Sequence, residues 1–250
     1  MHEIHLASSV LFEIAGFPVT NAILTTWIGM VVILVFALTA TRRVQLVPAG
    51  VQNVVEGIIE GLLGLVEQVF QDRAKAERYF PFLATFFLFI LVLNWMELIP
   101  TVLGGIEVGT AHGPAPLFRS ANTDLNTPLA LALISVIGTQ IAGIATLGIV
   151  KHAGHYFTFK PTFEGIIGTF VGLLHIISEV AKIISFTFRL FGNIFAGEVL
   201  LIVMTFLAPY LAPVPFYGLE LFVGFIQALV FTMLTLVFLA TATVETEHAH

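Results

Sequence analysis

An arginine and a glutamate nine positions apart lie in one of the most apolar stretches of this sequence. Arg189 and Glu198 belong to the run RLFGNIFAGEVL, in which most other side chains are apolar or small. A guanidinium stays protonated in proteins, and placing it at bilayer depth costs roughly 2.5 to 17 kcal/mol. A chain keeps such a residue where the charge has a partner or a task, so Arg189 is the first candidate for function.

Polar residues precede and follow Arg189 at helical spacing. On a helical wheel with about 100° per residue, five polar side chains share an arc of about 80°. These five are His175, Glu179, Lys182, Arg189 and Asn193. Gly197 continues the stripe, where the missing side chain lets another helix or a file of water approach closely. Glu198 lies on a different face, so one helix presents a cationic stripe on one side and a lone carboxylate on another.

The next apolar segment carries a second polar stripe. Glu220, Gly224 and Gln227 follow one another at helical spacing and share one face. Glu198 precedes the proline-rich turn 209–215 and Glu220 follows it, so the two carboxylates face each other if the helices form an antiparallel hairpin. Intramembrane carboxylates of this kind serve as steps in a proton relay.

Structural roles compete with these assignments. Arg189 would then form a salt bridge with Glu179 or Glu198 that only packs helices, and Lys182 would pair with Glu179 three positions before it. The other polar side chains would only pack or hydrogen-bond between helices: His175, Asn193 and Gln227.

Composition predicts an all-α polytopic membrane protein with one domain, 1–250. The chain of 250 residues is 58% hydrophobic and 10% charged, whereas soluble domains carry about 25% charged residues. Cysteine is absent, which excludes disulfides and thiol chemistry. Apolar stretches of spanning length, about 20 residues, predict about five membrane-embedded helices. They occupy 22–41, 82–103, 129–150, 163–207 and 216–243.

Two segments depart from a simple spanning pattern. A helix over 164–207 would be roughly 65 Å long, against a hydrocarbon core of about 30 Å. We therefore expect a long tilted hairpin over 163–243, with a bend at Gly192 or Gly197. The segment 50–71 has glutamates on one face and apolar residues on the other, which predicts an amphipathic helix on the inner surface. Its acidic face is either solvated or a protein docking face.

The basic residues predict the topology. Segments 42–80 and 151–161 hold five and two lysines and arginines, whereas 1–21, 104–128 and 208–215 together hold only Arg119. Basic residues concentrate in cytoplasmic loops. We therefore expect the N-terminal segment 1–21 outside and the C-terminus in the cytoplasm.

The run RLFGNIFAGEVL at 189–200 strongly resembles the signature of subunit a of F-type ATP synthases, called subunit 6 in mitochondria. Three other segments are similar to that family: NWMELIP at 94–100, ANTDLN at 121–126 and FIQALV at 225–230. The likeness extends from about residue 25 to 243. It implies a non-catalytic stator subunit without a cofactor or an active site of its own. This subunit would conduct protons across the membrane through two offset half-channels beside a rotating c-ring of small hairpin subunits. The b-type subunits of a peripheral stalk would be its other partners.

The resemblance also implies roles for individual residues. Arg189 matches the arginine that attracts the ring carboxylates and blocks a direct proton leak between two half-channels. Residues matching the outer half-channel are Asn193, Glu198, Glu220 and Gln227. An inner half-channel would contain His175, Glu179, Lys182 and Ser185. Some relatives carry histidine at one of the two carboxylate positions, whereas this chain has glutamate at both, which should still serve as a relay.

Two other classes of protein remain as alternatives. One is a secondary transporter in which Arg189 binds a carboxylate substrate, although such folds usually contain sequence repeats. The other is a membrane scaffold with a purely structural polar stripe. Binding of a separate ring of hairpin subunits would separate the first hypothesis from both. Nucleic-acid binding is not expected. Neither is a metal site, since His2 and His5, like His248 and His250, lie in the termini with no further ligands nearby. The N-terminal extension favours a bacterial plasma membrane over a mitochondrial inner membrane.

Overall fold

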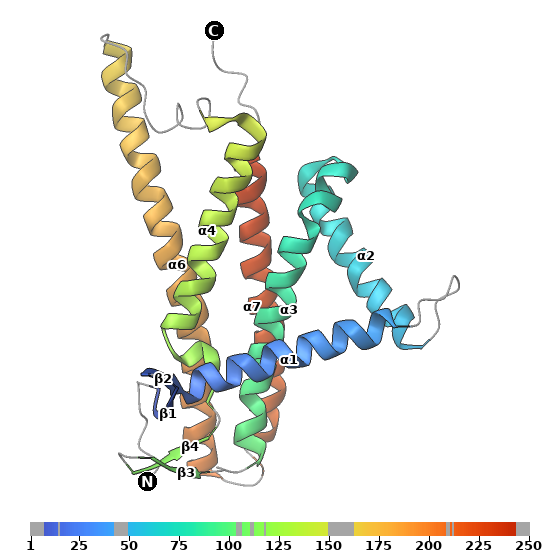
Figure 1. The fold of residues 1–250 in the computed structure, drawn as a ribbon, viewed down its shortest axis with the longest axis vertical. Helices are drawn as coiled ribbons and strands as arrows, with labels where there is room; N and C mark the ends of the chain where they lie inside the picture. Colours follow the sequence, from blue (N-terminus) through green and yellow to red (C-terminus); the bar gives the residue numbers. More distant parts are fainter. Residues whose placement is uncertain are drawn as a thin grey trace.

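The computed structural model of this chain is helical along most of its described length (Figure 1). It describes residues 8–14, 16–42, 50–103, 107–110, 113–117, 119–149, 163–208, 211 and 213–243. The predicted loop 151–161 and both chain ends lie outside these ranges. The α-helices are α1 (Asn21–Thr41), α2 (Val51–Phe70), α3 (Arg73–Leu103), α4 (Asn126–Leu147), α6 (Phe163–Leu207) and α7 (Pro213–Thr243).

The expected all-α polytopic membrane fold is confirmed. Within the described residues, five helices are long and apolar enough to cross a membrane, and α2 is not among them. The amphipathic helix predicted near 50–71 is present as α2. The chain is therefore an integral membrane protein.

Several helix boundaries differ from the predicted ones because local capping overrides hydropathy. α3 begins at Arg73 rather than at 82, since the Asp72 carboxylate accepts bonds from two backbone N–H groups of its first turn at 2.9 and 3.3 Å. α4 ends at Leu147 because Gly148 turns the backbone to a φ of +81°. α7 begins at Pro213, where a proline without an N–H group fits the first turn.

Two short antiparallel hairpins, which the sequence analysis did not predict, lie together near one end of the molecule (Figure 1). β1 (Val10–Ile14) pairs with β2 (Phe17–Thr20), and β3 (Glu107–Thr110) pairs with β4 (Gly113–Pro116). Each strand has four or five residues, which is too short for a clear alternation of apolar and polar side chains. The 3-10 helix η1 (Ala121–Thr123) follows the second hairpin.

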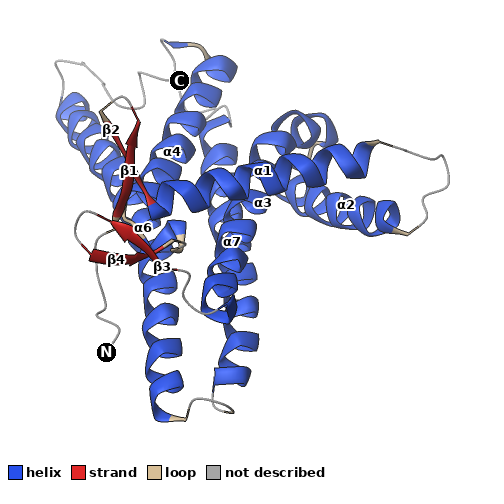
Figure 2. Ribbon diagram, turned by 60° about the horizontal axis from the view of Figure 1, so that its bottom comes forward, coloured by secondary structure: helices blue, strands red, loops and turns tan. Residues whose placement is uncertain are grey.

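α6 is one continuous helix of 45 residues, and neither Gly192 nor Gly197 interrupts it. At 1.5 Å per residue its length is about 67 Å, roughly twice the hydrocarbon thickness of a bilayer. It runs beside α4 and α7, while α1 crosses this bundle at a steep angle (Figures 1 and 2). α1 and the bundle therefore cannot both stand upright in one membrane.

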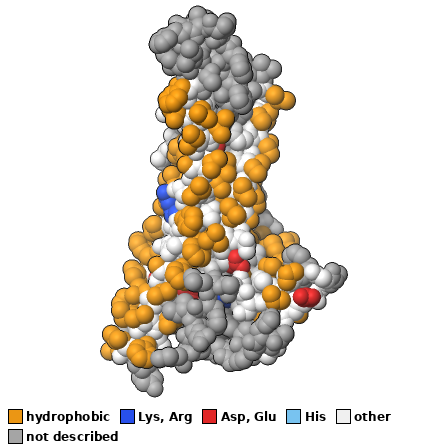
Figure 3. Space-filling view, turned by 90° about the vertical axis from the view of Figure 1, so that its left-hand side faces the viewer, with side chains coloured by type: hydrophobic (Ala, Val, Ile, Leu, Met, Phe, Trp, Pro, Cys, Tyr) orange, Lys and Arg blue, Asp and Glu red, His pale blue; other side chains and the backbone are white. Residues whose placement is uncertain are grey.

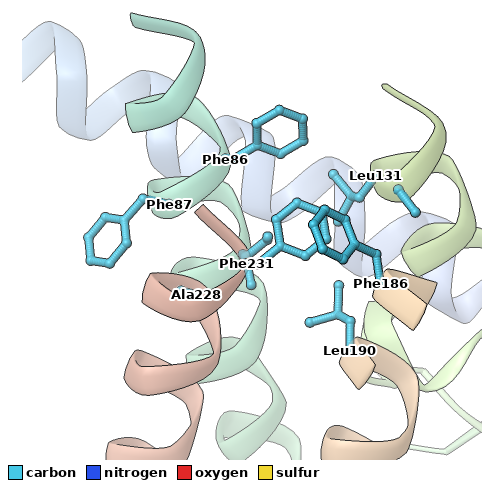
Figure 4. Packing of buried hydrophobic residues seen from close by; sticks show 9 residues of the cluster. Phe86, Phe87, Leu131, Phe186, Leu190, Ala228 and Phe231 are labelled. Carbon is cyan, nitrogen blue, oxygen red and sulfur yellow. The ribbon is translucent and has the colours of Figure 1, made fainter. Parts of the chain in front are cut away.

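An aromatic cluster holds α3, α6 and α7 together (Figure 4). The ring of Phe231 is fully buried, with its centroid 5.5 Å from that of Phe86 and 4.7 Å from that of Phe186. Leu190 of α6 and Leu131 of α4 belong to the same cluster. Because Phe186 and Leu190 are only 2% and 0% exposed, they determine which face of α6 turns toward the bundle.

Close packing of α4 on α3 yields a first prediction. A Cβ added at Gly138 would lie 2.5 Å from Cζ of Phe82, whose ring packs edge-on against Phe86. We expect Gly138→Ala to destabilise the folded protein by about 1 to 3 kcal/mol, as overpacking does elsewhere. The free energy of unfolding can be measured in mixed detergent micelles by titration with SDS.

Gly61→Ala in α2 is the matched control, since a Cβ there would meet no described atom within 4 Å. This control should stabilise the helix by up to about 1 kcal/mol. Equal stability of the two variants would contradict the packing of Gly138 on Phe82.

Candidate functional site

Arg189 is an exposed residue of α6 that lies beside the face packed on the aromatic cluster. Its neighbour Leu190 is buried, whereas Arg189 itself is exposed. Apolar side chains of the same stretch of α6 are also exposed, Ile184 at 52% and Phe188 at 58%. Seen from the side of α6, the surface is largely hydrophobic with isolated charged groups (Figure 3). A permanent charge therefore stands on an apolar surface.

The competing role of Arg189 as a packing salt bridge does not fit this geometry. Glu179 forms its ion pair with Lys182, at 2.6 Å between Oε1 and Nζ. Glu198 is half-buried on another face of α6. Within the described part of the chain, Arg189 makes neither a hydrogen bond nor a salt bridge.

Glu220 of α7 packs directly on α6 at Gly197. A Cβ added at Gly197 would lie 2.5 Å from the carboxyl carbon of Glu220, so only glycine admits the carboxylate here. Glu198 is the next residue of α6. The hairpin of α6 and α7 thus brings both predicted carboxylates to one level, as their positions on either side of the turn suggested.

Unpaired polar atoms surround these carboxylates. Among the described residues, three of the predicted outer-channel side chains have a buried atom without a hydrogen-bond partner: Asn193 Nδ2, Glu198 Oε2 and Gln227 Nε2. Gln227 is only 8% exposed. Buried polar groups normally find a partner in protein or in ordered water, and a polar site of this kind suits water. These three atoms are therefore suited to bind ordered water.

The sequence analysis missed how Asn94 and Arg119 join this region. Asn94 Nδ2 donates to the Gly224 carbonyl at 3.0 Å, and Asn94 Oδ1 accepts from Asn122 Nδ2 at 2.8 Å. Arg119 entered only as the single outer basic residue, yet it is 9% exposed and its Nε donates to Thr123 Oγ1 at 3.1 Å. The available signal was their position in the sequence. Asn94 is the first residue of the similar segment 94–100, and Arg119 lies two residues before the similar segment 121–126.

The predicted inner residues divide into two pairs. Glu179 and Lys182 are about four-fifths buried and bonded to each other. The Lys182 ammonium also lies 4.4 Å from the ring centroid of Phe238 on α7, a cation–π contact. His175 and Ser185 are exposed along α6. The predicted pairing of Lys182 with Glu179 is therefore confirmed.

The contact between Gly197 and Glu220 yields a second prediction. We expect Gly197→Ala to lower the free energy of unfolding by about 1 to 3 kcal/mol, because the new methyl group overlaps the carboxylate. In the Glu220→Ala background the same substitution should cost nothing, since alanine favours helices over glycine by about 1 kcal/mol. Unfolding by SDS measures the four corners of this double-mutant cycle.

Gly192→Ala serves as the control on the same helix, because a Cβ there meets no described atom within 4 Å. It should leave the free energy of unfolding unchanged or raised in both backgrounds. An equal cost of Gly197→Ala with and without Glu220 would show that the two residues do not touch.

Comparison with known proteins agrees with this architecture. Residues 23–240 match the family model described as ATP synthase A chain. ATP synthase subunit a of Moorella thermoacetica is 32% identical over 236 residues, covering 94% of this chain and 96% of that protein. Subunit a of Campylobacter fetus is 32% identical over 247 residues, covering 99% of both chains. Subunit a of Campylobacter jejuni (strain 81-176) is 35% identical over 225 residues, covering 88% of this chain and 89% of that protein. The resemblance of the run around Arg189 is thereby confirmed, and this chain belongs to the ATP synthase A chain family.

Proposed function

We propose that this chain is the proton-conducting stator subunit in the membrane sector of an F-type ATP synthase, without an active site of its own. The observation that carries the proposal is Arg189, an exposed charge of α6 that makes neither a hydrogen bond nor an ion pair among the described residues. A rotating c-ring with one carboxylate per hairpin subunit would supply the missing partner. Its apolar surface would also cover the exposed apolar side chains beside Arg189.

The chemistry of arginine suits this task. The fixed positive charge attracts a ring carboxylate only while that carboxylate is ionised, so the carboxylate must take up a proton before it moves into lipid. Because a guanidinium does not release its proton, Arg189 also blocks direct proton transfer between the two half-channels. Each proton crossing 100 mV releases about 2.3 kcal/mol, which biases the rotation that drives ATP synthesis.

We assign the outer half-channel to Asn193, Glu198, Glu220 and Gln227. The unpaired buried atoms of three of these residues support a water-containing route. The placement of Glu220 on Gly197 supports proton exchange between neighbouring carboxylates.

We assign the inner half-channel to His175, Glu179, Lys182 and Ser185. Glu179 uses one carboxylate oxygen for Lys182, while the other is buried without a partner among the described residues. That second oxygen is free to accept a hydrogen bond from water. The exposed His175 and Ser185 lie on the same helix, on either side of the ion pair.

The crossing of α1 over the bundle supports a tilted hairpin. α1 has 21 residues, or about 32 Å, which matches an upright crossing of a bilayer of about 30 Å. The bundle of α4, α6 and α7 would then lie steeply tilted and would follow the curved wall of the ring. The basic residues support an outer N-terminus and a cytoplasmic C-terminus. The bacterial relatives support location in a bacterial plasma membrane.

The acidic side of α2 is a candidate contact for the b-type subunits of the peripheral stalk. Glu56 and Glu60 are exposed on this side of α2. Arg73 forms salt bridges with Glu67 and Glu77 at 2.8 Å each, which stabilise the connection between α2 and α3.

The experiment that tests this proposal is Arg189→Ala in membrane vesicles carrying the whole complex. We expect the variant to assemble, to lose ATP-driven proton pumping, and to leak protons passively through the joined half-channels. A fluorescent pH indicator records pumping, and decay of an imposed pH gradient records the leak. Arg42→Ala, at an exposed arginine at the end of α1, should behave as wild type. Normal pumping by the assembled Arg189→Ala complex would overturn the proposal.

A further prediction concerns the two glutamates of the outer half-channel. Replacing both, in Glu198→Gln/Glu220→Gln, removes both proton acceptors and should slow pumping by about tenfold or more. It should cause no passive leak, because Arg189 remains in place. Glu13→Gln, at an exposed glutamate of β1, is the matched control. Wild-type pumping rates in the double variant would remove both glutamates from the proton route.

A further inference from the structure

Two consecutive residues of α3 donate side-chain hydrogen bonds to α7. Asn94 Nδ2 lies 3.0 Å from the carbonyl oxygen of Gly224, and Trp95 Nε1 lies 3.1 Å from that of Leu221. These two carbonyl groups are three residues apart, so they lie about one turn apart on the same face of α7. A carbonyl oxygen has two lone pairs, so both bonds add to the helical hydrogen bonds of α7 without replacing them.

The remaining contacts between α3 and α7 in this region are not directional. They join aromatic rings, such as Phe86 with Phe231 and Phe87 with Phe225, at centroid distances of 5.5 and 5.8 Å. Apolar packing tolerates sliding better than hydrogen bonds do, because hydrogen bonds need a narrow range of distance and angle. Two hydrogen bonds at one level therefore add a defined axial and rotational reference to the aromatic packing of α7 on α3.

Gly224 allows the helices to come this close. A Cβ added there would lie 3.1 Å from Cβ of Asn94 and 3.5 Å from Cδ1 of Trp95. In the sequence, Gly224 appeared only as part of the stripe between Glu220 and Gln227. The structure gives it a partner on another helix.

The position held by these bonds lies between the two functional residues of α7. Glu220 directly precedes Leu221, and Gln227 follows Gly224 by three residues. A shift of α7 by one turn would move Glu220 by about 5.4 Å. Such a shift would take its carboxylate away from Gly197.

Asn94 also connects α7 to α6 by a second route. Its Oδ1 accepts the amide of Asn122, which is fully buried in η1, and η1 packs on α6. Asn94 itself is 3% exposed. A buried amide that loses its partner is costly, so the network favours one arrangement of α3, η1, α6 and α7.

We propose that Asn94 and Trp95 are positioning residues that hold α7 at the level where Glu220 meets α6. This inference rests on the proposed function, since it gives the level of Glu220 a role in proton exchange. The charged or titratable groups that share this region are Glu198 from α6, Glu220 and Tyr217 from α7, and Arg119 ahead of η1. Changing the level of Glu220 relative to them changes the pH range in which it exchanges protons.

The test uses Asn94→Leu/Trp95→Phe, which removes both donors while nearly preserving volume. Trp95→Phe alone, which keeps a ring at this position, serves if the double variant fails to assemble. Trp27→Phe is the matched control, since it makes the same change at the other tryptophan of the chain, exposed on α1.

The first measurement is the distance between spin labels on Lys75→Cys and Val214→Cys. Both sites are exposed, they lie on α3 and α7, and the chain has no other cysteine. In Asn94→Leu/Trp95→Phe and in Trp95→Phe we expect the distance distribution to broaden or shift, by up to about 5.4 Å for a full turn. The control should keep the wild-type distribution.

The second measurement is the dependence of proton-driven ATP synthesis on outer pH. We expect the midpoint of this pH dependence to move by about half a pH unit or more in Asn94→Leu/Trp95→Phe and in Trp95→Phe. It should stay unchanged in the Trp27→Phe control. A role in stability alone would reduce the amount of assembled complex without moving this midpoint. Unchanged distances, or changed distances with a wild-type midpoint, would overturn the proposal. Normal pumping by Arg189→Ala would overturn the proposed function instead, and the spin-label distances do not depend on that result.

Discussion

The cost of placing a permanent charge in an apolar environment governs the arrangement of this protein. Arg189 remains charged, and a guanidinium at bilayer depth needs either a partner or access to water. The aromatic cluster around Phe231 buries Phe186 and Leu190 of α6. Arg189 lies beside this packed face, about 60° from Phe186 on the helical wheel, and is exposed where no described group of this chain compensates its charge. The rotation of α6 about its axis therefore sets both its buried face and the exposure of Arg189.

The outer region combines close packing with incomplete hydrogen bonding. Glycine at 197 admits the Glu220 carboxylate against the backbone of α6, and glycine at 224 admits Asn94 against α7. Around these tight contacts, Glu198 and Gln227 retain buried polar atoms without partners among the described residues. Rigid helices thus surround a polar interior that suits water.

The inner region is built differently. Lys182 pairs with Glu179 within α6, and its ammonium lies against the ring of Phe238, so a cation–π contact joins α6 to α7 there. Removing one partner of a buried pair is costly, since the other charge is left uncompensated. The ion pair within α6 therefore helps to keep the Lys182 ammonium against α7. The two ends of the hairpin share a polar stripe but differ in how completely its groups are paired.

Local patterns in the sequence by themselves determined the five apolar helices, the amphipathic helix α2 and the polar stripe of α6, because hydropathy and the helical period depend on neighbouring residues. The placement of Glu198 and Glu220 at one level also followed from the sequence, since a single tight turn joins their helices. Only the tertiary structure decided the contacts between distant segments. Asn94 and Gly224 are 130 positions apart, and no local pattern predicts which amide meets which carbonyl. The burial of Arg119 and the outward direction of Arg189 are likewise decided by packing, because the same helix could turn either polar face toward its neighbours until the aromatic side chains interlock.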